Sequence, residues 1–198
     1  MTTADLVIHG GQVVSPDSVI QASVAIHDGH IMAVGSEAAM PPARETLDAR
    51  GLHVLPGAID VHVHFRDPGY PHKEDWQTGT AAAAFGGVTT VFDMPNTIPP
   101  TGTASILADK QRIAGANAHV DFGLYGLLGE DTIEHVPALV EGGVIGFKLY
   151  MGNTWSPRAS SVSRAGGIAA SDPTAMICPS WMATLAWMTE SGDTTWPP

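Results

Sequence analysis

Apolar and polar positions follow two different rhythms along this chain of 198 residues. In the first part, short runs rich in β-branched residues span 5–14, 19–27 and 30–34. A G-G turn lies within the first run, and the turn motifs S-P-D and D-G separate the runs. Short runs of this kind with turns between them are typical of antiparallel sheets. The pattern therefore predicts a small antiparallel β module of the β-sandwich type over residues 1–55.

From residue 56 onward, apolar strands alternate with helical stretches. We expect strands at 58–63, 88–93, 120–125 and 144–150, and helices near 74–85, 103–114 and 132–140. Each strand and its helix take about thirty residues together, which is the length of a βαβ unit in a parallel sheet. The predicted fold class is therefore α/β: a partial (β/α)8 barrel of the TIM type, with about four βα units over residues 56–154.

The composition changes after residue 154. Residues 155–198 hold four of the five tryptophans but no histidine and no lysine, and Pro179 interrupts the one stretch, 175–189, that has a helical pattern. We interpret this segment as an atypical tail, either disordered or produced by a shifted reading frame. Because a complete barrel needs about 250 residues, we expect a truncated protein that carries only the first half of one.

Composition also narrows the classes of function. The chain is 44% hydrophobic and has a formal net charge of -11, so it can bury a core but offers no basic surface for nucleic acid. The sequence begins without a signal peptide, and no apolar run reaches the length of a membrane span. We therefore expect a cytoplasmic protein that binds neither nucleic acid nor membrane. The single cysteine, Cys178, cannot form a cysteine cluster, so a metal would depend on the nine histidines and the carboxylates.

The candidate chemistry lies at the end of the first barrel strand, where residues 59–64 are I-D-V-H-V-H. His62 and His64 are two residues apart on a strand, so both imidazoles project from the same face. Active sites of (β/α)8 barrels lie at the carboxyl ends of the strands. Two ordinary half-buried histidines are the alternative, but the strand context favours a metal site. We expect Asp60 to orient a ligand rather than to bind metal itself.

Three sequence blocks resemble the dihydroorotase, allantoinase and hydantoinase group of the amidohydrolase superfamily. They are P-G-A-I-D-V-H-V-H-F-R-D-P-G at 56–69, G-G-V-T-T followed by D-M-P-N-T-I-P-P within 86–100, and G-F-K-L-Y-M-G at 146–152. The resemblance extends over about residues 5–154 and then stops. It implies hydrolysis of a cyclic amide with two divalent ions, expected to be zinc, which lower the pKa of a bridging water.

The resemblance also implies roles for individual residues. His62 and His64 would bind metal, and Lys148, converted to a carbamate by carbon dioxide, would bridge the two ions. Arg66 and Asn96 would bind the carboxylate side of the substrate. The alternatives are a surface or phosphate-binding lysine, a solvated arginine and an asparagine that forms a turn. The family's catalytic carboxylate and two further histidines belong to later strands, and no residue of this chain is assigned to them.

Three functions follow from these observations. The first is a dihydroorotase-like enzyme that interconverts dihydroorotate and N-carbamoyl-aspartate in pyrimidine synthesis, which M-P-N-T at 94–97 favours. The second is an allantoinase or hydantoinase, because a bridging lysine suits those branches as well. The third is a non-catalytic fragment or structural subunit, because no histidine follows His135 to complete the site. The expected partner is a small-molecule substrate, and the family's habit of forming dimers or tetramers predicts a homo-oligomer.

Overall fold

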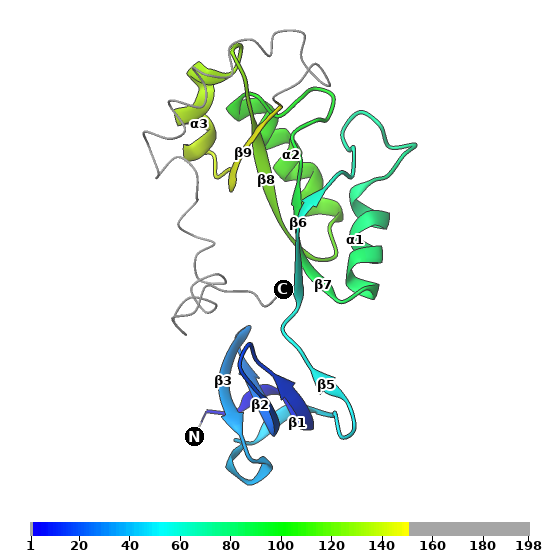
Figure 1. The fold of residues 1–198 in the computed structure, drawn as a ribbon, viewed down its shortest axis with the longest axis vertical. Coiled ribbons are helices and arrows are strands. Elements are labelled where there is room, and N and C mark those ends of the chain that lie inside the picture. Colours follow the sequence, from blue (N-terminus) through cyan, green and yellow to red (C-terminus); the bar gives the residue numbers. More distant parts are fainter. Residues whose placement is uncertain (1, 151–198) are drawn as a thin grey trace. The chain divides into compact units, whose positions relative to one another are not determined.

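The computed structural model describes residues 2–150, and the chain divides at Gly57 into two compact units (Figure 1). The predicted tail at 155–198, with its possible helix, lies outside the described residues. Among the described helices, none has the length and apolar character that crossing a membrane requires.

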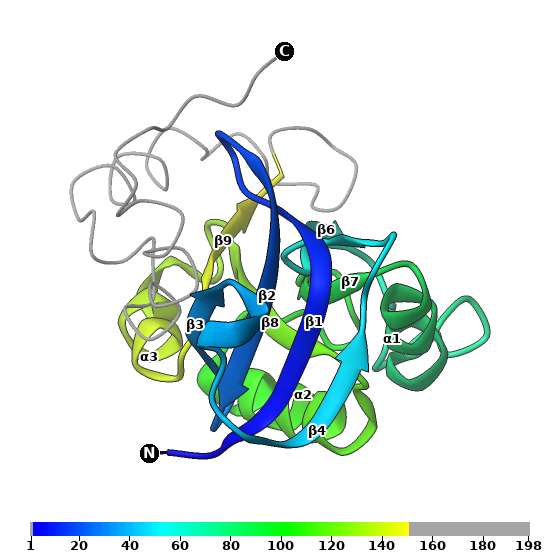
Figure 2. The ribbon, with the colours of Figure 1, turned by 90° about the horizontal axis from the view of Figure 1, so that it is seen from below.

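The first unit is a five-stranded sheet built around its first strand. The strands are β1 (Ala4–Val14), β2 (Val19–His27), β3 (His30–Gly35), β4 (Ala43–Asp48) and β5 (His53–Val54). β2 pairs antiparallel with β1, and β3 pairs antiparallel with β2. β4 and β5 both pair parallel with β1, and Figure 2 shows β1 between β2 and β4. The antiparallel pairing predicted for residues 5–14, 19–27 and 30–34 is confirmed in β1, β2 and β3. The parallel strand β4 was not predicted, and it makes the sheet mixed.

The sequence of β4, A-R-E-T-L-D, explains why this strand was not predicted. All but its first residue are exposed, so the strand has no apolar alternation that would reveal it. A short 3-10 helix, η1 (Glu37–Ala39), separates it from β3 and allows the chain to return parallel to β1. Backbone hydrogen bonding rather than side-chain burial therefore holds this strand in the sheet.

The second unit is a curled parallel sheet in which helices connect successive strands. Its elements are β6 (Ala58–Val63), α1 (Trp76–Phe85), β7 (Val88–Asp93), α2 (Ala104–Asn117), β8 (Asp121–Leu128), η2 (Ile133–His135), α3 (Val136–Glu141) and β9 (Gly146–Leu149). The strand order is β6-β7-β8-β9, and every neighbouring pair runs parallel. This is the first part of a (β/α)8 barrel, so the predicted fold class is confirmed.

Local signals explain where the helices begin and end. The Asp75 carboxylate accepts a hydrogen bond from the Thr78 N–H at 2.8 Å, and Thr103 caps α2 in the same way. The third helix is shorter than predicted: a 3-10 turn precedes α3, which ends at Glu141 and is capped by Gly142. Two glycine pairs, 86–87 and 142–143, each lie between a helix and the next strand. Their second members, Gly87 and Gly143, have positive φ.

Aromatic and aliphatic side chains from both layers fill the core of this unit. The Trp76 ring is fully buried, with ring centroids 5.0 Å from Phe65 and 5.3 Å from Phe122. Its indole N–H donates to the Asp67 carbonyl at 3.1 Å, so its one polar atom is satisfied. Leu107 and Leu139 bring α2 and α3 into the same cluster. The loop that follows β6 is thus fastened to the hydrophobic core.

An ion pair between Asp93 and Lys110 is buried in the same unit. Both residues are 0% exposed, and Lys110 Nζ lies 2.6 Å from Asp93 Oδ2. The ammonium also donates to the Met94 carbonyl at 2.9 Å, while Asp93 Oδ1 accepts the Phe65 N–H at 2.9 Å. Burial lowers the pKa of Lys110, and the negative charge of Asp93 opposes that shift. The pair connects the ends of β6 and β7 to α2.

Replacement of Lys110 by Met should destabilise the protein by about 3–5 kcal/mol, because it leaves the Asp93 charge buried without a partner. Urea unfolding followed by circular dichroism measures this loss. The double variant Asp93→Asn/Lys110→Met should recover part of it, since no uncompensated charge remains. The control Lys73→Met removes an exposed ammonium and should change the free energy of unfolding by about 0.5 kcal/mol or less. A Lys110→Met loss as small as the control's would contradict the assignment.

Candidate metal centre

The two histidines of the H-V-H motif meet at the carboxyl end of β6. His62 Nε2 lies 3.2 Å from His64 Nε2, and the ring centroids are 5.1 Å apart. Two nitrogen ligands of a tetrahedral zinc ion, each about 2.0–2.1 Å from the metal, are about 3.4 Å apart. The observed separation therefore fits two ligands of one divalent ion.

The backbone that carries these histidines departs from a regular strand. Asp60 pairs with Val91 and Val63 with Asp93, so β6 advances three residues while β7 advances two. Such bulges often redirect side chains next to active sites. The Asp60 carboxylate accepts the His62 backbone N–H at 3.0 Å. Asp60 therefore contacts the main chain of His62, and its role in orienting a metal ligand stays a prediction.

His64 is held by a side chain from the loop after β7. Its Nδ1 lies 2.8 Å from the side-chain oxygen of Asn96, which is 7% exposed. Burial lowers the pKa of His64 against the opposing effect of this hydrogen bond, and the positive charge of Arg66 acts in the same direction as burial. A lowered pKa favours the neutral imidazole, which is the form that binds metal.

Arg66 follows the histidine pair in a left-handed backbone conformation, with φ of 65°. Its carbonyl accepts the Tyr70 N–H at 2.8 Å, which closes the turn. Its charge lowers the pKa of Tyr150 against the dominant raising effect of burial, and it also acts on His64. The Arg66 guanidinium therefore acts on the pKa of His64, which follows β6, and on the pKa of Tyr150, which follows β9.

The loop that contains Arg66 is docked on the next loop of the barrel. The Pro68 carbonyl accepts the Ile98 N–H at 2.9 Å. Gly69 has φ of 116°, and a Cβ there would lie 2.6 Å from Ile98 Cβ, so only glycine fits. This contact holds the loops after β6 and β7 together, and these are the loops that carry Arg66 and Asn96.

Lys148 lies on β9, with Nζ 5.4 Å from the centroid of the Tyr150 ring. Within residues 2–150, no hydrogen bond or ion pair joins it to His62 or His64. The structure thus brings His62, His64 and Asn96 into contact, and it places Lys148 on another strand of the same sheet. The Asp93–Lys110 pair beneath them is not among the residues predicted from the sequence.

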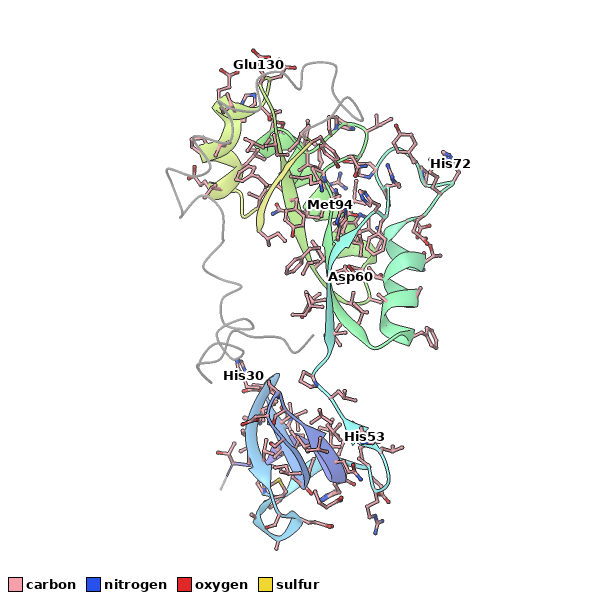
Figure 3. All side chains as sticks on the ribbon, viewed as in Figure 1. His30, His53, Asp60, His72, Met94 and Glu130 are labelled. Carbon is pink, nitrogen blue, oxygen red and sulfur yellow. The ribbon has the colours of Figure 1, made fainter. Side chains whose placement is uncertain are left out.

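Other histidines belong to other parts of the protein. His30 and His53 lie in the β module and His72 in the loop before α1, as Figure 3 shows; Asp60 on β6 and Met94 directly after β7 are labelled there for reference. The sequence favours structural roles for these histidines.

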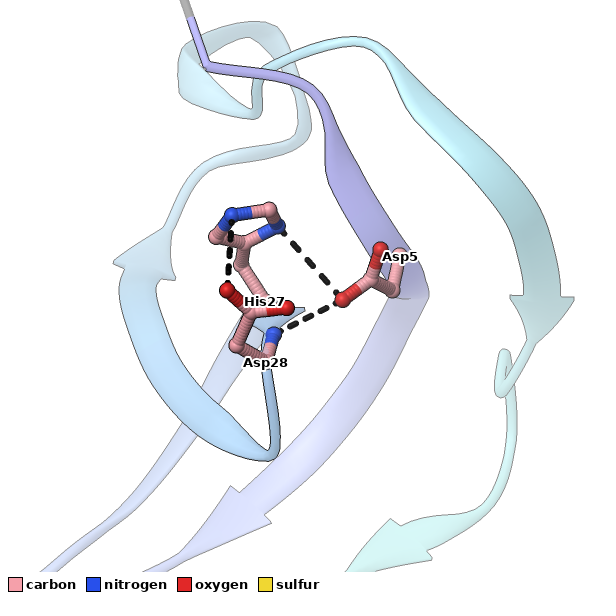
Figure 4. Close-up of side chains that lie close together, drawn as sticks. All are labelled: Asp5, His27 and Asp28. Atoms are coloured by element: carbon pink, nitrogen blue, oxygen red, sulfur yellow. Dashed lines mark hydrogen bonds and ion pairs between the residues drawn. The ribbon is translucent and has the colours of Figure 1, made fainter.

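A second group of possible ligands, Asp5, His27 and Asp28, lies in the β module (Figure 4). His27 Nδ1 faces Asp5 at 3.4 Å, whereas Nε2 faces Asp28 at 3.5 Å. Asp5 also accepts the Asp28 backbone N–H at 2.7 Å, which is the main cause of its lowered pKa, and pairs with Arg44 at 3.1 Å. Because the two ring nitrogens face different carboxylates, we interpret this group as a charge network that closes the β2–β3 turn.

Comparison with known proteins assigns the chain to a family. A family model described as dihydro-orotase-like matches residues 51–150. The chain belongs to the dihydroorotase-like family. The resemblance predicted from the three sequence blocks is confirmed.

Members of the dihydroorotase-like family with different names match this chain at similar levels. An allantoinase from Rubrobacter xylanophilus is 44% identical over 158 residues, which are 79% of this chain and 34% of that protein. A dihydroorotase from Methanothermobacter thermautotrophicus is 41% identical over 135 residues, 68% of this chain and 30% of that protein. The structure of L-hydantoinase from Arthrobacter aurescens matches with a TM-score of 0.74 at 30% identity, covering 79% of this chain and 36% of that one. The chain spans about a third of the length of these relatives.

If one ion binds between the two histidines, then His62→Ala and His64→Ala should each weaken zinc binding by about tenfold or more, because each removes one of the few ligands. Isothermal titration calorimetry with zinc measures the affinity. The control His72→Ala removes an exposed loop imidazole and should leave the affinity unchanged. Equal affinities in all four proteins would place the metal elsewhere.

Proposed function

We propose that this chain carries part of the metal centre of a hydrolase that opens the C–N bond of a cyclic amide. The observation that carries this proposal is the pair of facing Nε2 atoms of His62 and His64 at the carboxyl end of a parallel strand, in a member of the dihydroorotase-like family. Divalent ions, proposed to be two zinc ions, would supply a hydroxide near neutral pH and polarise the amide carbonyl.

Lys148 is the proposed third protein ligand. Its neutral amine would attack carbon dioxide, forming an N–C bond and releasing one proton, and the resulting carbamate would bind metal as a carboxylate does. Support comes from its position on β9, which belongs to the same sheet as β6. A carbamate supplies two oxygens and a negative charge, so it offsets part of the charge of two divalent cations.

Arg66 and Asn96 are the proposed substrate-binding residues. Both lie in loops that follow barrel strands, and the Pro68–Ile98 hydrogen bond joins these loops. The Arg66 guanidinium would pair with an anionic group on the substrate, and the Asn96 amide N–H groups would donate to a ring oxygen or a carboxylate. An anionic cyclic amide therefore suits the pair better than a neutral one.

Dihydroorotate, which carries a carboxylate on its ring, is accordingly the first proposed substrate, with N-carbamoyl-aspartate as the product of ring opening in the context of pyrimidine synthesis. Allantoin or a hydantoin is the second candidate. The allantoinase names of relatives at 41–44% identity and the hydantoinase structure support it. A non-catalytic subunit that keeps the fold is the third candidate, and the following experiment separates all three.

The gene product at full length, supplied with zinc and bicarbonate, should hydrolyse dihydroorotate faster than allantoin or hydantoin when the three are assayed in parallel. Lys148→Ala should abolish turnover, and mass spectrometry of the native protein should find one added carbon dioxide on the wild type but not on this variant. Lys73→Ala is the matched control, because Lys73 is exposed and lies outside the site. Faster turnover of allantoin or hydantoin would favour the second candidate. Absence of both turnover and bound zinc would favour the non-catalytic subunit.

A further inference from the structure

We infer that Asn96 is a positioning residue that fixes the tautomer of His64. Its oxygen holds a proton on His64 Nδ1 and so keeps the Nε2 lone pair directed toward His62. The use of that lone pair for metal binding rests on the proposed function, but the tautomer itself does not.

The chemistry of the two side chains carries the inference. An amide oxygen only accepts hydrogen bonds, so at 2.8 Å the His64 Nδ1 must be the donor. A neutral imidazole has one N–H, and its Nε2 is therefore unprotonated. The Nε2 of His62 lies 3.2 Å away, so an unprotonated His64 Nε2 requires His62 Nε2 to be the donor in this contact. Had both Nε2 atoms carried protons, the two N–H groups would oppose each other.

The loop around Asn96 keeps its oxygen in place. Met94 donates its N–H to the Val63 carbonyl at 3.0 Å and accepts from Lys110 through its own carbonyl. The Thr97 and Thr101 N–H groups both donate to the Pro95 carbonyl at 3.0 Å. Residues 93–97 are all buried, so Asn96 is fixed on both sides by satisfied backbone. A buried amide oxygen left without a donor would cost about 1–3 kcal/mol, which opposes rotation away from His64.

The side-chain nitrogen of Asn96 remains available as a hydrogen-bond donor. Within residues 2–150, Asn96 Nδ2 donates no hydrogen bond to protein. One side chain can therefore hold a metal ligand through its oxygen and contact a substrate through its nitrogen. This arrangement makes two separable predictions, because an aspartate keeps the acceptor and loses the donor, whereas a leucine loses both.

The test is a long-range proton–nitrogen NMR spectrum of the histidine side chains in metal-free protein, recorded above the pKa of histidine. In the wild type and in Asn96→Asp, His64 should show a protonated Nδ1 and an unprotonated Nε2. In Asn96→Leu the proton should move to Nε2 or exchange between the two nitrogens. Asn117→Asp, at an exposed helix end, is the matched control and should leave the His64 pattern unchanged.

Zinc titration supplies the second measurement. Asn96→Leu should weaken binding by about 10–100-fold, as expected for loss of a residue that orients a metal ligand, and Asn96→Asp should bind zinc as tightly as the wild type or more tightly. A wild-type His64 protonated on Nε2 would overturn the inference even if the leucine variant fails to fold. An unchanged tautomer in a folded Asn96→Leu would overturn it too. The predicted tautomers without zinc binding would uphold the inference and refute the proposed metal centre.

Discussion

The buried pair of Asp93 and Lys110 is the constraint on which the geometry of the site depends. A buried charge is tolerated only with a partner and satisfied hydrogen bonds, and here the two ions together engage the Phe65 N–H and the Met94 carbonyl. Phe65 immediately follows His64, and Met94 lies two residues before Asn96. One ion pair therefore fixes both backbones from which the His64–Asn96 hydrogen bond is made.

In this arrangement, the residues that support the site are different from the residues that are proposed to bind metal. Lys110 and Asp93 are fully buried, whereas His62 is exposed at the end of its strand and His64 is only partly buried. Burial lowers the pKa of His64, which favours the neutral imidazole that can bind a cation. Rigid elements with satisfied polar groups position reactive side chains more precisely than loops alone can. Here the docked loops after β6 and β7 extend that rigidity to Arg66 and Asn96.

The sequence predicted those features that depend on local pattern. Alternating strands and helices revealed the parallel sheet, and the two-residue spacing placed His62 and His64 together. The polar strand β4 gave no such signal, because pairing with β1 holds it rather than burial. The contact between His64 and Asn96 spans 32 residues and forms only in the tertiary structure. Lys110 shares a helix face with Leu107 and Ala114, all of them buried, so its burial was open to prediction from helical spacing.

The central claim is that one divalent ion binds between His62 and His64. Crystals of the protein grown with zinc, measured on both sides of the zinc absorption edge, test it most directly. An anomalous peak is expected within bonding distance of both Nε2 atoms, about 2.0–2.1 Å, with Asn96 still hydrogen-bonded to His64 Nδ1. A peak at Asp5, His27 and Asp28 without one at the histidine pair, or no peak in either place, would contradict it.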